Sequence, residues 1–207
     1  MATLGFLRRD FDVFAIDDFS ARLAKIDQLV TPRLMQLAPD FNRELARNLQ
    51  MVFYPHYARH THRAANPPAE TWAAWGPSPN GYRRHGYLAL YISGVGIHAR
   101  AVVQSAADHR PEMAQAIKSK SAHLEKSFRG TKIQQYQNWE GRELPNSIAA
   151  SASFFDGLGD ALAKKSGAID VGFGWTVRDA LTVDRAEVLD AFRELGPLYR
   201  LILSVAS

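Results

Sequence analysis

Two apolar segments joined by a glycine-containing turn constrain this sequence more than any other feature. Residues 87–92 and 97–103 are rich in branched and aromatic side chains, and the Ser-Gly-Val-Gly connection at 93–96 is typical of a β-hairpin. If Ile92 pairs with Ile97, the register is set, because side chains alternate between the two faces of a strand. One face then carries only apolar residues, namely Leu88, Leu90, Ile92, Ile97, Ala99, Ala101 and Val103. The other face carries Tyr87, Ala89, Tyr91, His98, Arg100 and Val102. We therefore expect a sheet with one core face and one aromatic, basic face.

Apolar spacing predicts the remaining helices and strands. Steps of three or four residues predict helical regions over residues 23–49, 112–128, 152–165 and 185–205. Strands are predicted over residues 51–57, 71–75, 131–138 and 169–175, in addition to the hairpin. Ser20 is suited to cap the first helical region, Pro32 and Pro39 are suited to the first turns of new helices, and Pro197 predicts a kink. Residues 8–19 fit either a short strand or a helical turn.

The order of these elements predicts the fold class. Helices come first, then adjacent strands joined by hairpins, then alternating elements, which favours an α+β fold with a largely antiparallel sheet flanked by helices. A chain of 207 residues that is 46% hydrophobic suffices for one packed core, so we expect a single domain over residues 1–207.

Composition also bears on location. No apolar run reaches the roughly eighteen residues of a membrane helix, and the first ten residues lack the apolar stretch of a signal peptide. These observations predict a cytoplasmic protein with no membrane partner. The absence of cysteine excludes disulfides, thiolate zinc sites and cysteine nucleophiles.

Positive charge is concentrated in residues 51–107. This segment holds the arginines Arg59, Arg63, Arg83, Arg84 and Arg100. Glu70 is its one acid, so the excess of four positive charges equals the net charge of +4 of the whole chain. The same segment carries five histidines and many aromatic residues. Any positive electrostatic field of this protein therefore belongs to this region.

A distinctive motif lies within the basic segment, and it carries a family resemblance. The motif reads Pro55-His56-x3-His60-x2-Arg63-x2-Asn66-Pro67-Pro68-x3-Trp72, followed by Gly81-Tyr82-Arg83. With it, the chain resembles the YktB-like family, a set of uncharacterised bacterial proteins that carry a domain of unknown function. The resemblance implies a compact α+β fold with an antiparallel sheet flanked by helices, distantly similar to the catalytic core of class II synthetases and biotin ligases. It implies no established activity, and similarity of fold does not transfer function.

The arginines and histidines of this motif suggest an anion site. Guanidinium groups that converge on one pocket bind phosphate or carboxylate oxygens in bidentate fashion, and little acid is available nearby to neutralise them. We therefore predict a small anionic ligand, phosphorylated or nucleotide-like. The predicted ligand-binding residues are His56, Arg59, His60, Arg63, Asn66, Tyr82, Arg83 and Arg84. The alternative for the arginines is ordinary solvated surface charge.

A metal site and a catalytic centre are less well supported. The spacing of His56, His60 and His62 is compatible with metal ligation, but Glu70 is the one carboxylate nearby and the flanking arginines repel a cation. No metal or other cofactor is therefore predicted. The sequence contains no Gly-x-Ser-x-Gly elbow and no assignable carboxylate pair. If the protein is an enzyme, His56 or His60 is the available proton-transfer group. The sequence leaves open whether it is one, and we assign no catalytic residue.

Two other functions stay open. A single-stranded nucleic acid could stack on the aromatic, basic face of the hairpin, through Tyr87, Tyr91, His98 and Arg100. Alternatively, the motif could stabilise the fold of a structural or interaction protein that has no ligand.

Overall fold

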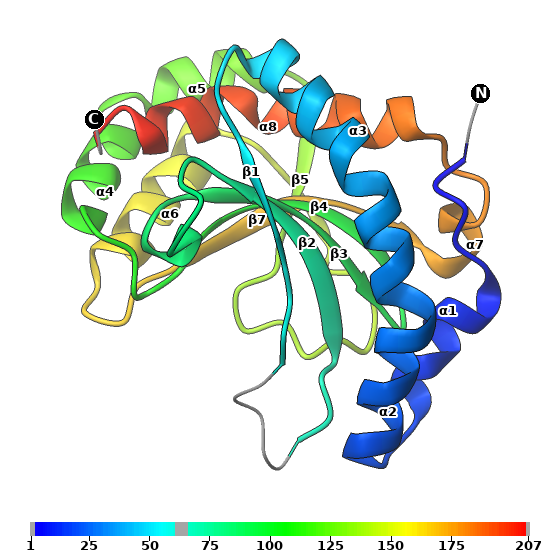
Figure 1. The fold of residues 1–207 in the computed structure, drawn as a ribbon. Coiled ribbons are helices and arrows are strands. Elements are labelled where there is room, and N and C mark those ends of the chain that lie inside the picture. The colour runs from blue at the N-terminus through cyan, green and yellow to red at the C-terminus, as the bar shows by residue number, and fades with distance from the viewer. Residues whose placement is uncertain (1–2, 61–65, 206–207) are drawn as a thin grey trace.

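One antiparallel sheet organises the molecule (Figure 1). The computed structural model describes residues 3–60 and 66–205. Within these residues the sheet has seven strands in the order β1-β2-β3-β4-β7-β5-β6, and every neighbouring pair is antiparallel. The strands are β1 (Tyr54–Tyr57), β2 (Glu70–Gly76), β3 (Tyr87–Ser93), β4 (Gly96–Val103), β5 (Lys132–Gln135), β6 (Ser147–Ala149) and β7 (Ile169–Thr176).

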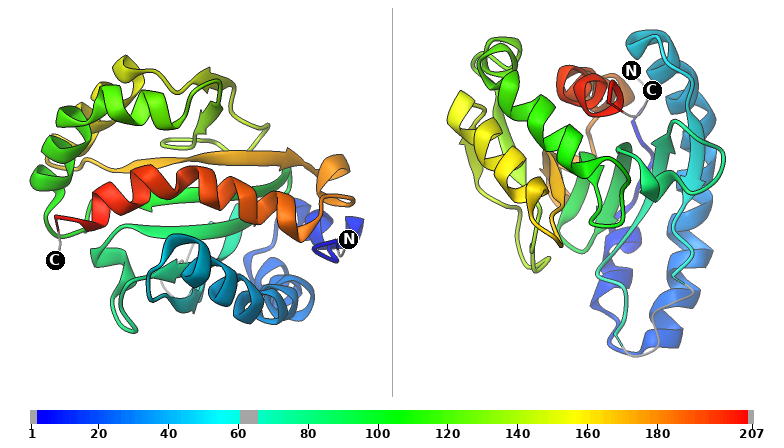
Figure 2. Two further views of the ribbon diagram at one scale, coloured as in Figure 1. Left: turned by 90° about the horizontal axis from the view of Figure 1, so that it is seen from above. Right: turned by 90° about the vertical axis from the view of Figure 1, so that its left-hand side faces the viewer.

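Helices cover one face of this sheet. The α-helices are α1 (Arg8–Asp12), α2 (Phe19–Lys25), α3 (Thr31–Leu49), α4 (Arg110–Ser119), α5 (Ser121–Ser127), α6 (Ala152–Ala163), α7 (Val177–Ala180) and α8 (Arg185–Leu203). Three short elements are the 3-10 turns η1 (Val13–Ala15) and η3 (Tyr82–Arg84) and the π-helical turn η2 (Ile26–Val30). Figure 2 shows α8 across the middle of the sheet, with α3 on one side of it and α4 and α6 on the other. This arrangement confirms the predicted α+β class.

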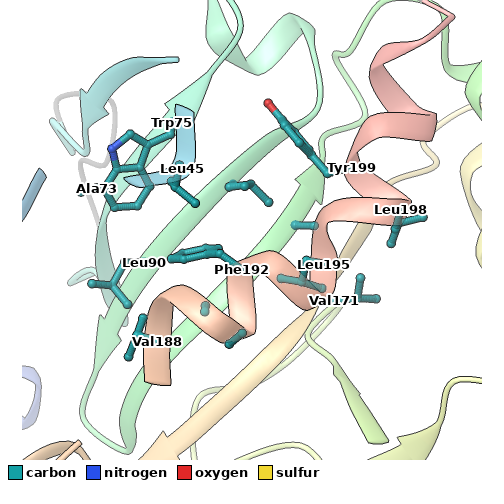
Figure 3. Packing of buried hydrophobic residues seen from close by; sticks show 14 of the residues in the cluster. Leu45, Ala73, Trp75, Leu90, Val171, Val188, Phe192, Leu195, Leu198 and Tyr199 are labelled. Atoms are coloured by element: carbon teal, nitrogen blue, oxygen red, sulfur yellow. The ribbon is translucent and has the colours of Figure 1, made fainter. Parts of the chain in front are cut away.

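The core lies between these helices and the apolar face of the hairpin. Ile92 pairs with Ile97, as predicted, and the apolar residues of β3 and β4 are all buried. Phe192 of α8 contacts Trp75 edge to face, with ring centroids 5.8 Å apart (Figure 3). It contacts Phe41 edge to face as well, with centroids 6.2 Å apart. Since Phe41 belongs to α3 and Trp75 to β2, these three rings join two helices to the sheet.

Several element boundaries differ from the prediction. Pro39, predicted to begin a new helix, lies inside α3, whereas Pro197 lies inside α8, as expected of a proline within a helical region over residues 185–205. A proline in a helix costs about 3 kcal/mol, but each of these helices buries a long apolar stripe that outweighs it. Asp18, rather than Ser20, caps α2 by accepting a hydrogen bond from the Ala21 backbone N–H. The predicted helix over 112–128 is broken at Lys120 into α4 and α5.

The N-terminal residues and the short elements also compare with the prediction. Residues 8–15, where a strand and a helical turn were both open, form α1 and η1. Pro32 lies in the first turn of α3, as predicted. Strand β6 and helix α7 were not predicted. No helix within residues 3–60 and 66–205 is both long and apolar enough to cross a membrane.

The second face of the sheet has the predicted composition but not the predicted exposure. In the register of β3 and β4, Tyr91 lies opposite His98 and Ala89 opposite Arg100, so the aromatic and basic residues do share a face. A small apolar cluster forms there from Trp72, Ala74, Tyr87, Ala89, Tyr91 and Val102. The η3 turn packs onto this cluster through Tyr82, and residues 136–139 after β5 pack on His98 of the same face. The candidate site lies at the η3 end of this face.

Candidate anion-binding site

A cavity of about 770 Å³ opens where β1, β2 and η3 meet. Its walls come from Pro55, His56, Tyr57, Arg59, His60, Trp72, Pro79, Asn80, Gly81, Tyr82, Arg83, Arg84 and Gln104. Three arginines and two histidines line it, and none of these lining residues is an aspartate or glutamate. The described part of the predicted motif therefore converges largely on one pocket.

The loop between β2 and β3 brings Tyr82 into this pocket. Gly76 ends β2, and a Cβ atom placed on it would lie 2.9 Å from Cβ of Tyr82, so glycine allows the chain to fold back closely. Gly81 has φ of 63°, in the left-handed region that glycine adopts at little cost, and it begins η3. The turn places the Tyr82 ring against His56 of β1, stacked with centroids 4.3 Å apart.

The Tyr82 hydroxyl links the neighbouring side chains. Its oxygen accepts a hydrogen bond from Trp72 Nε1 at 3.1 Å and another from Arg83 Nε at 3.3 Å. The Arg83 guanidinium lies over two rings, with its central carbon 5.5 Å from the Trp72 centroid and 5.7 Å from that of Tyr82. Such cation–π contacts hold an arginine in place without neutralising its charge. No carboxylate within the described residues pairs with Arg83.

The two described histidines of the motif are held by protein groups. His56 Nε2 donates to the backbone carbonyl of Ser78 at 2.9 Å. Partial burial lowers the pKa of His56 from its ordinary value, although the bond to Ser78 opposes this shift. His56 is therefore neutral at neutral pH. His60 has a positive φ of 47°, its Nε2 is 3.1 Å from the Thr71 hydroxyl oxygen, and its ring meets Trp72 edge to face.

The other predicted site residues differ in their surroundings. Arg59 is exposed at the pocket wall and has no acidic partner among the described residues. Arg84 also lines the pocket, but its charge is compensated by Asp108, with Nε to Oδ2 at 2.9 Å and Nη2 to Oδ1 at 3.2 Å. Asn66 is exposed and does not line the pocket. Arg63, like His62, lies outside the described residues.

The pocket also contains residues that the sequence did not single out as ligand contacts. Trp72 is buried in the apolar cluster of the second face, and its ring also lies beneath the Arg83 guanidinium. Gln104 lies directly after β4, and its Nε2 donates to the Tyr87 hydroxyl at 2.9 Å. Gln104 is a polar residue directly after the apolar run of β4, at the rim of the second face. This position is the sequence signal that could have identified it as a pocket residue.

A buried cluster of charges continues the second face beyond Trp72. The Arg100 side chain is 1% exposed, and its guanidinium carbon lies 4.2 Å from the Tyr91 ring centroid and 3.8 Å from that of Tyr136. It pairs with Glu70 at 2.8 Å and with Asp170 at 3.3 Å. Burial raises the pKa of Asp170 to about 6, against the opposing effect of Arg100. The charge of Arg100 is thus compensated within the fold.

This burial corrects the expectation that the hairpin face is open to bases. Tyr87 and His98 are 0% exposed, and Tyr91 and Arg100 are 4% and 1% exposed. The cause is the segment after β5, where Tyr136 and Trp139 pack on His98 and Arg100. Stacking of bases on these four residues is incompatible with this conformation. Nucleic-acid binding elsewhere on the protein stays a prediction.

Metal ligation also stays open. Within residues 3–60 and 66–205 no group of three or more histidine, aspartate or glutamate side chains is arranged to hold a metal ion. His62, the third member of the proposed histidine set, is not among these residues.

The buried His98 predicts a pH dependence of stability. Burial, with a smaller effect from Arg100, holds the pKa of His98 well below its ordinary value of 6.5, whereas the unfolded chain binds a proton near 6.5. The unfolded state therefore binds more protons below pH 6.5, and stability falls as pH decreases through that window. We therefore expect His98 to contribute a loss of stability as the pH falls from 6.5 to 5.

Urea unfolding at pH 7.5 and 5 measures this contribution. Asp170, with its raised pKa, contributes in the opposite direction between about pH 4 and 6, so the wild-type protein alone does not isolate His98. His98→Gln removes the titrating ring and keeps an amide near the position of Nε2, which lies 2.8 Å from the Ser93 hydroxyl oxygen. We expect this variant to lose less stability on acidification than wild type. Equal losses in both proteins would show that His98 is not responsible.

Comparison with known proteins places this architecture in a family. A family model described as a domain of unknown function (DUF1054) matches residues 6–199. The chain is 35% identical over 95 residues to a UPF0637 protein of Lysinibacillus sphaericus, an alignment that covers 45% of each chain. It is 34% identical over 83 residues to a UPF0637 protein of Staphylococcus haemolyticus, covering 40% of this chain and 41% of the relative. In both cases the chain covers less than half of the relative's own length.

These matches agree with the resemblance to the YktB-like family, whose motif residues His56, His60 and Tyr82 form the pocket described above. The family model covers most of the chain, from the first helices through the sheet to α8. The chain therefore belongs to the family of bacterial proteins that carry the domain of unknown function DUF1054.

Proposed function

We propose that this protein binds a small anionic ligand, phosphorylated or nucleotide-like, in the pocket between β1, β2 and η3, with Arg83 as its principal contact. The observation that carries the proposal is that the Arg83 guanidinium is held in place without a compensating negative charge. It is fixed over Trp72 and Tyr82, its Nε is bonded to the Tyr82 hydroxyl, and it has no carboxylate partner within the described residues. Its two Nη groups make no hydrogen bond there and form a fork suited to two oxygens of one anion.

The charges around Arg83 support the same conclusion. Arg59 adds a second uncompensated positive charge on the pocket wall, and the lining contains no acidic side chain to repel an anion. Arg84 is compensated by Asp108 and adds little. His56 is neutral, so it adds no positive charge to that of the two arginines.

Removing the Arg83 side chain is expected to weaken anion binding strongly. A charge-assisted hydrogen bond contributes about 1.5–3 kcal/mol, so Arg83→Ala should raise the dissociation constant of pyrophosphate about 10-fold to 100-fold. Isothermal titration calorimetry at pH 7.5 and low salt measures it. Arg83→Lys keeps the charge but loses the planar fork, and it should give an intermediate value.

Arg178→Ala is the matched control, because it removes the same charge from a side chain that is 91% exposed and, among the described residues, paired only with its neighbour Asp179. It should bind pyrophosphate as wild type does. If Arg83→Ala and Arg178→Ala both bind like wild type, Arg83 is not an anion contact and the proposal fails.

The same variants separate ligand binding from a purely structural role. Arg83 is exposed, so its removal should change the free energy of unfolding by no more than about 1 kcal/mol, the contribution of an exposed cation–π pair. A much larger loss of stability, with no pyrophosphate binding by wild type, would favour the structural alternative.

A further inference from the structure

The hydrogen-bond capacity of the Tyr82 hydroxyl is only partly used by the protein. A phenol oxygen has two acceptor positions and one proton to donate. Trp72 Nε1 and Arg83 Nε are both donors without acceptor capacity, and they occupy the two acceptor positions of Tyr82. The phenol proton has no acceptor among the described residues. Tyr82 can therefore donate to a ligand oxygen beside the free fork of Arg83.

Two further lining residues offer acceptors instead. His56 Nε2 faces a carbonyl oxygen, which only accepts, so Nε2 carries the proton of this neutral ring. His56 Nδ1 is then an acceptor, and it makes no hydrogen bond among the described residues. Gln104 donates its amide N–H to the Tyr87 hydroxyl, and its side-chain carbonyl oxygen is a second acceptor without a hydrogen bond in the described part of the chain. The pocket thus combines donors suited to phosphate oxygens with acceptors suited to hydroxyl groups.

The aromatic rings of the pocket are already engaged with one another. Trp72 contacts Arg83 and also Tyr91, with ring centroids 5.2 Å apart. The Tyr82 ring is stacked on His56 and meets Tyr87 edge to face at 4.9 Å. A planar base would have to displace one of these contacts in order to stack on Trp72 or Tyr82. The geometry disfavours recognition of a ligand through a nucleobase.

We infer that the ligand class of this pocket is a phosphorylated sugar or polyol, recognised through its phosphate and its hydroxyl groups and not through a stacked base. The inference rests on the proposed anion site. The phosphate group accepts from the fork of Arg83 and from the Tyr82 hydroxyl. Ligand hydroxyl groups donate to His56 Nδ1 and to the Gln104 carbonyl oxygen. A cavity of about 770 Å³ holds a ligand of this size, which inorganic phosphate alone would not fill.

Calorimetric titration of the wild-type protein with inorganic phosphate, ribose 5-phosphate and AMP tests the inference. Two hydroxyl hydrogen bonds should make ribose 5-phosphate bind about tenfold tighter than phosphate. AMP carries the same phosphorylated ribose with an added base, and it should bind no tighter than ribose 5-phosphate. If ribose 5-phosphate binds no tighter than phosphate, or if AMP binds tenfold tighter than ribose 5-phosphate, the inference is overturned while the anion site stands.

Variants identify the acceptors. His56→Phe keeps an aromatic ring beside Tyr82 but removes the Nδ1 acceptor, and it should reduce the preference for ribose 5-phosphate over phosphate. Gln104→Leu should do the same. The readout is the ratio of the two affinities, which a general weakening of the fold does not change. An unchanged ratio in both variants would contradict the roles of His56 and Gln104. If none of the three probes binds wild type, the proposed function itself fails, and the inference fails with it.

Discussion

Arg100→Ala is expected to lower the free energy of unfolding by about 3–5 kcal/mol, because it leaves two carboxylates without the cation that compensates them. Glu70 and Asp170 are only 24% and 20% exposed, and both pair with the guanidinium of Arg100. The substitution also removes the planar group between the Tyr91 and Tyr136 rings and leaves a cavity there. Urea unfolding at pH 7.5 measures the loss.

Two companion variants sharpen this test. Arg8→Ala breaks an ion pair whose side chains are 71% and 58% exposed, and it should cost no more than about 1 kcal/mol. Arg100→Lys retains the positive charge but loses the paired hydrogen bonds to Glu70, so its stability should lie between wild type and Arg100→Ala. A loss for Arg100→Ala as small as that for Arg8→Ala would show that the buried cluster contributes little.

Phe192→Ala should destabilise the fold by a similar amount, about 3–5 kcal/mol, through the cavity that it creates. Phe192 is fully buried where α8 meets α3 and β2, against Phe41 and Trp75. Because all three elements meet at this ring, the surrounding side chains have little freedom to collapse into the vacated volume. Thermal or urea unfolding followed by circular dichroism provides the measurement.

Met35→Ala on α3 is the control for Phe192→Ala, since Met35 is 52% exposed and lies outside the core cluster. Its effect should stay within about 0.5 kcal/mol. If Phe192→Ala cost no more than about 1 kcal/mol, the core would have to repack around the missing ring, contrary to the close packing of Phe192 against Phe41 and Trp75.

Those features of the sheet that depend only on neighbouring residues could be predicted from the sequence. The pairing of Ile92 with Ile97 and the two faces of the hairpin follow from the period of two along a strand, which needs no knowledge of the rest of the chain. Pro39 misled the prediction of where a helix begins, because the burial that carries α3 past this proline is a tertiary effect. The three exposed residues of β6 carry no hydrophobic period at all.

In the candidate site, too, local features could be predicted from the sequence and long-range contacts could not. The basic segment and its motif could be located from the sequence, and six of the eight predicted residues line one pocket. The differences among its arginines could not be predicted, because Arg84 is compensated by Asp108, 24 residues away, whereas Arg83 has no such partner in the described chain. Burial of His98 and Arg100 likewise depends on Tyr136 and Trp139, which approach only once β5 joins the sheet.

The position of a bound anion tests the proposed site most directly. Crystals of the wild-type protein soaked in tungstate, a heavy tetrahedral analogue of phosphate, should show anomalous density within hydrogen-bond distance of the Arg83 Nη atoms and the Tyr82 hydroxyl. The same soak of Arg83→Ala crystals should leave this position empty. Tungstate bound only elsewhere on the wild-type protein, or bound equally in the variant, would contradict the assignment of this pocket as an anion site.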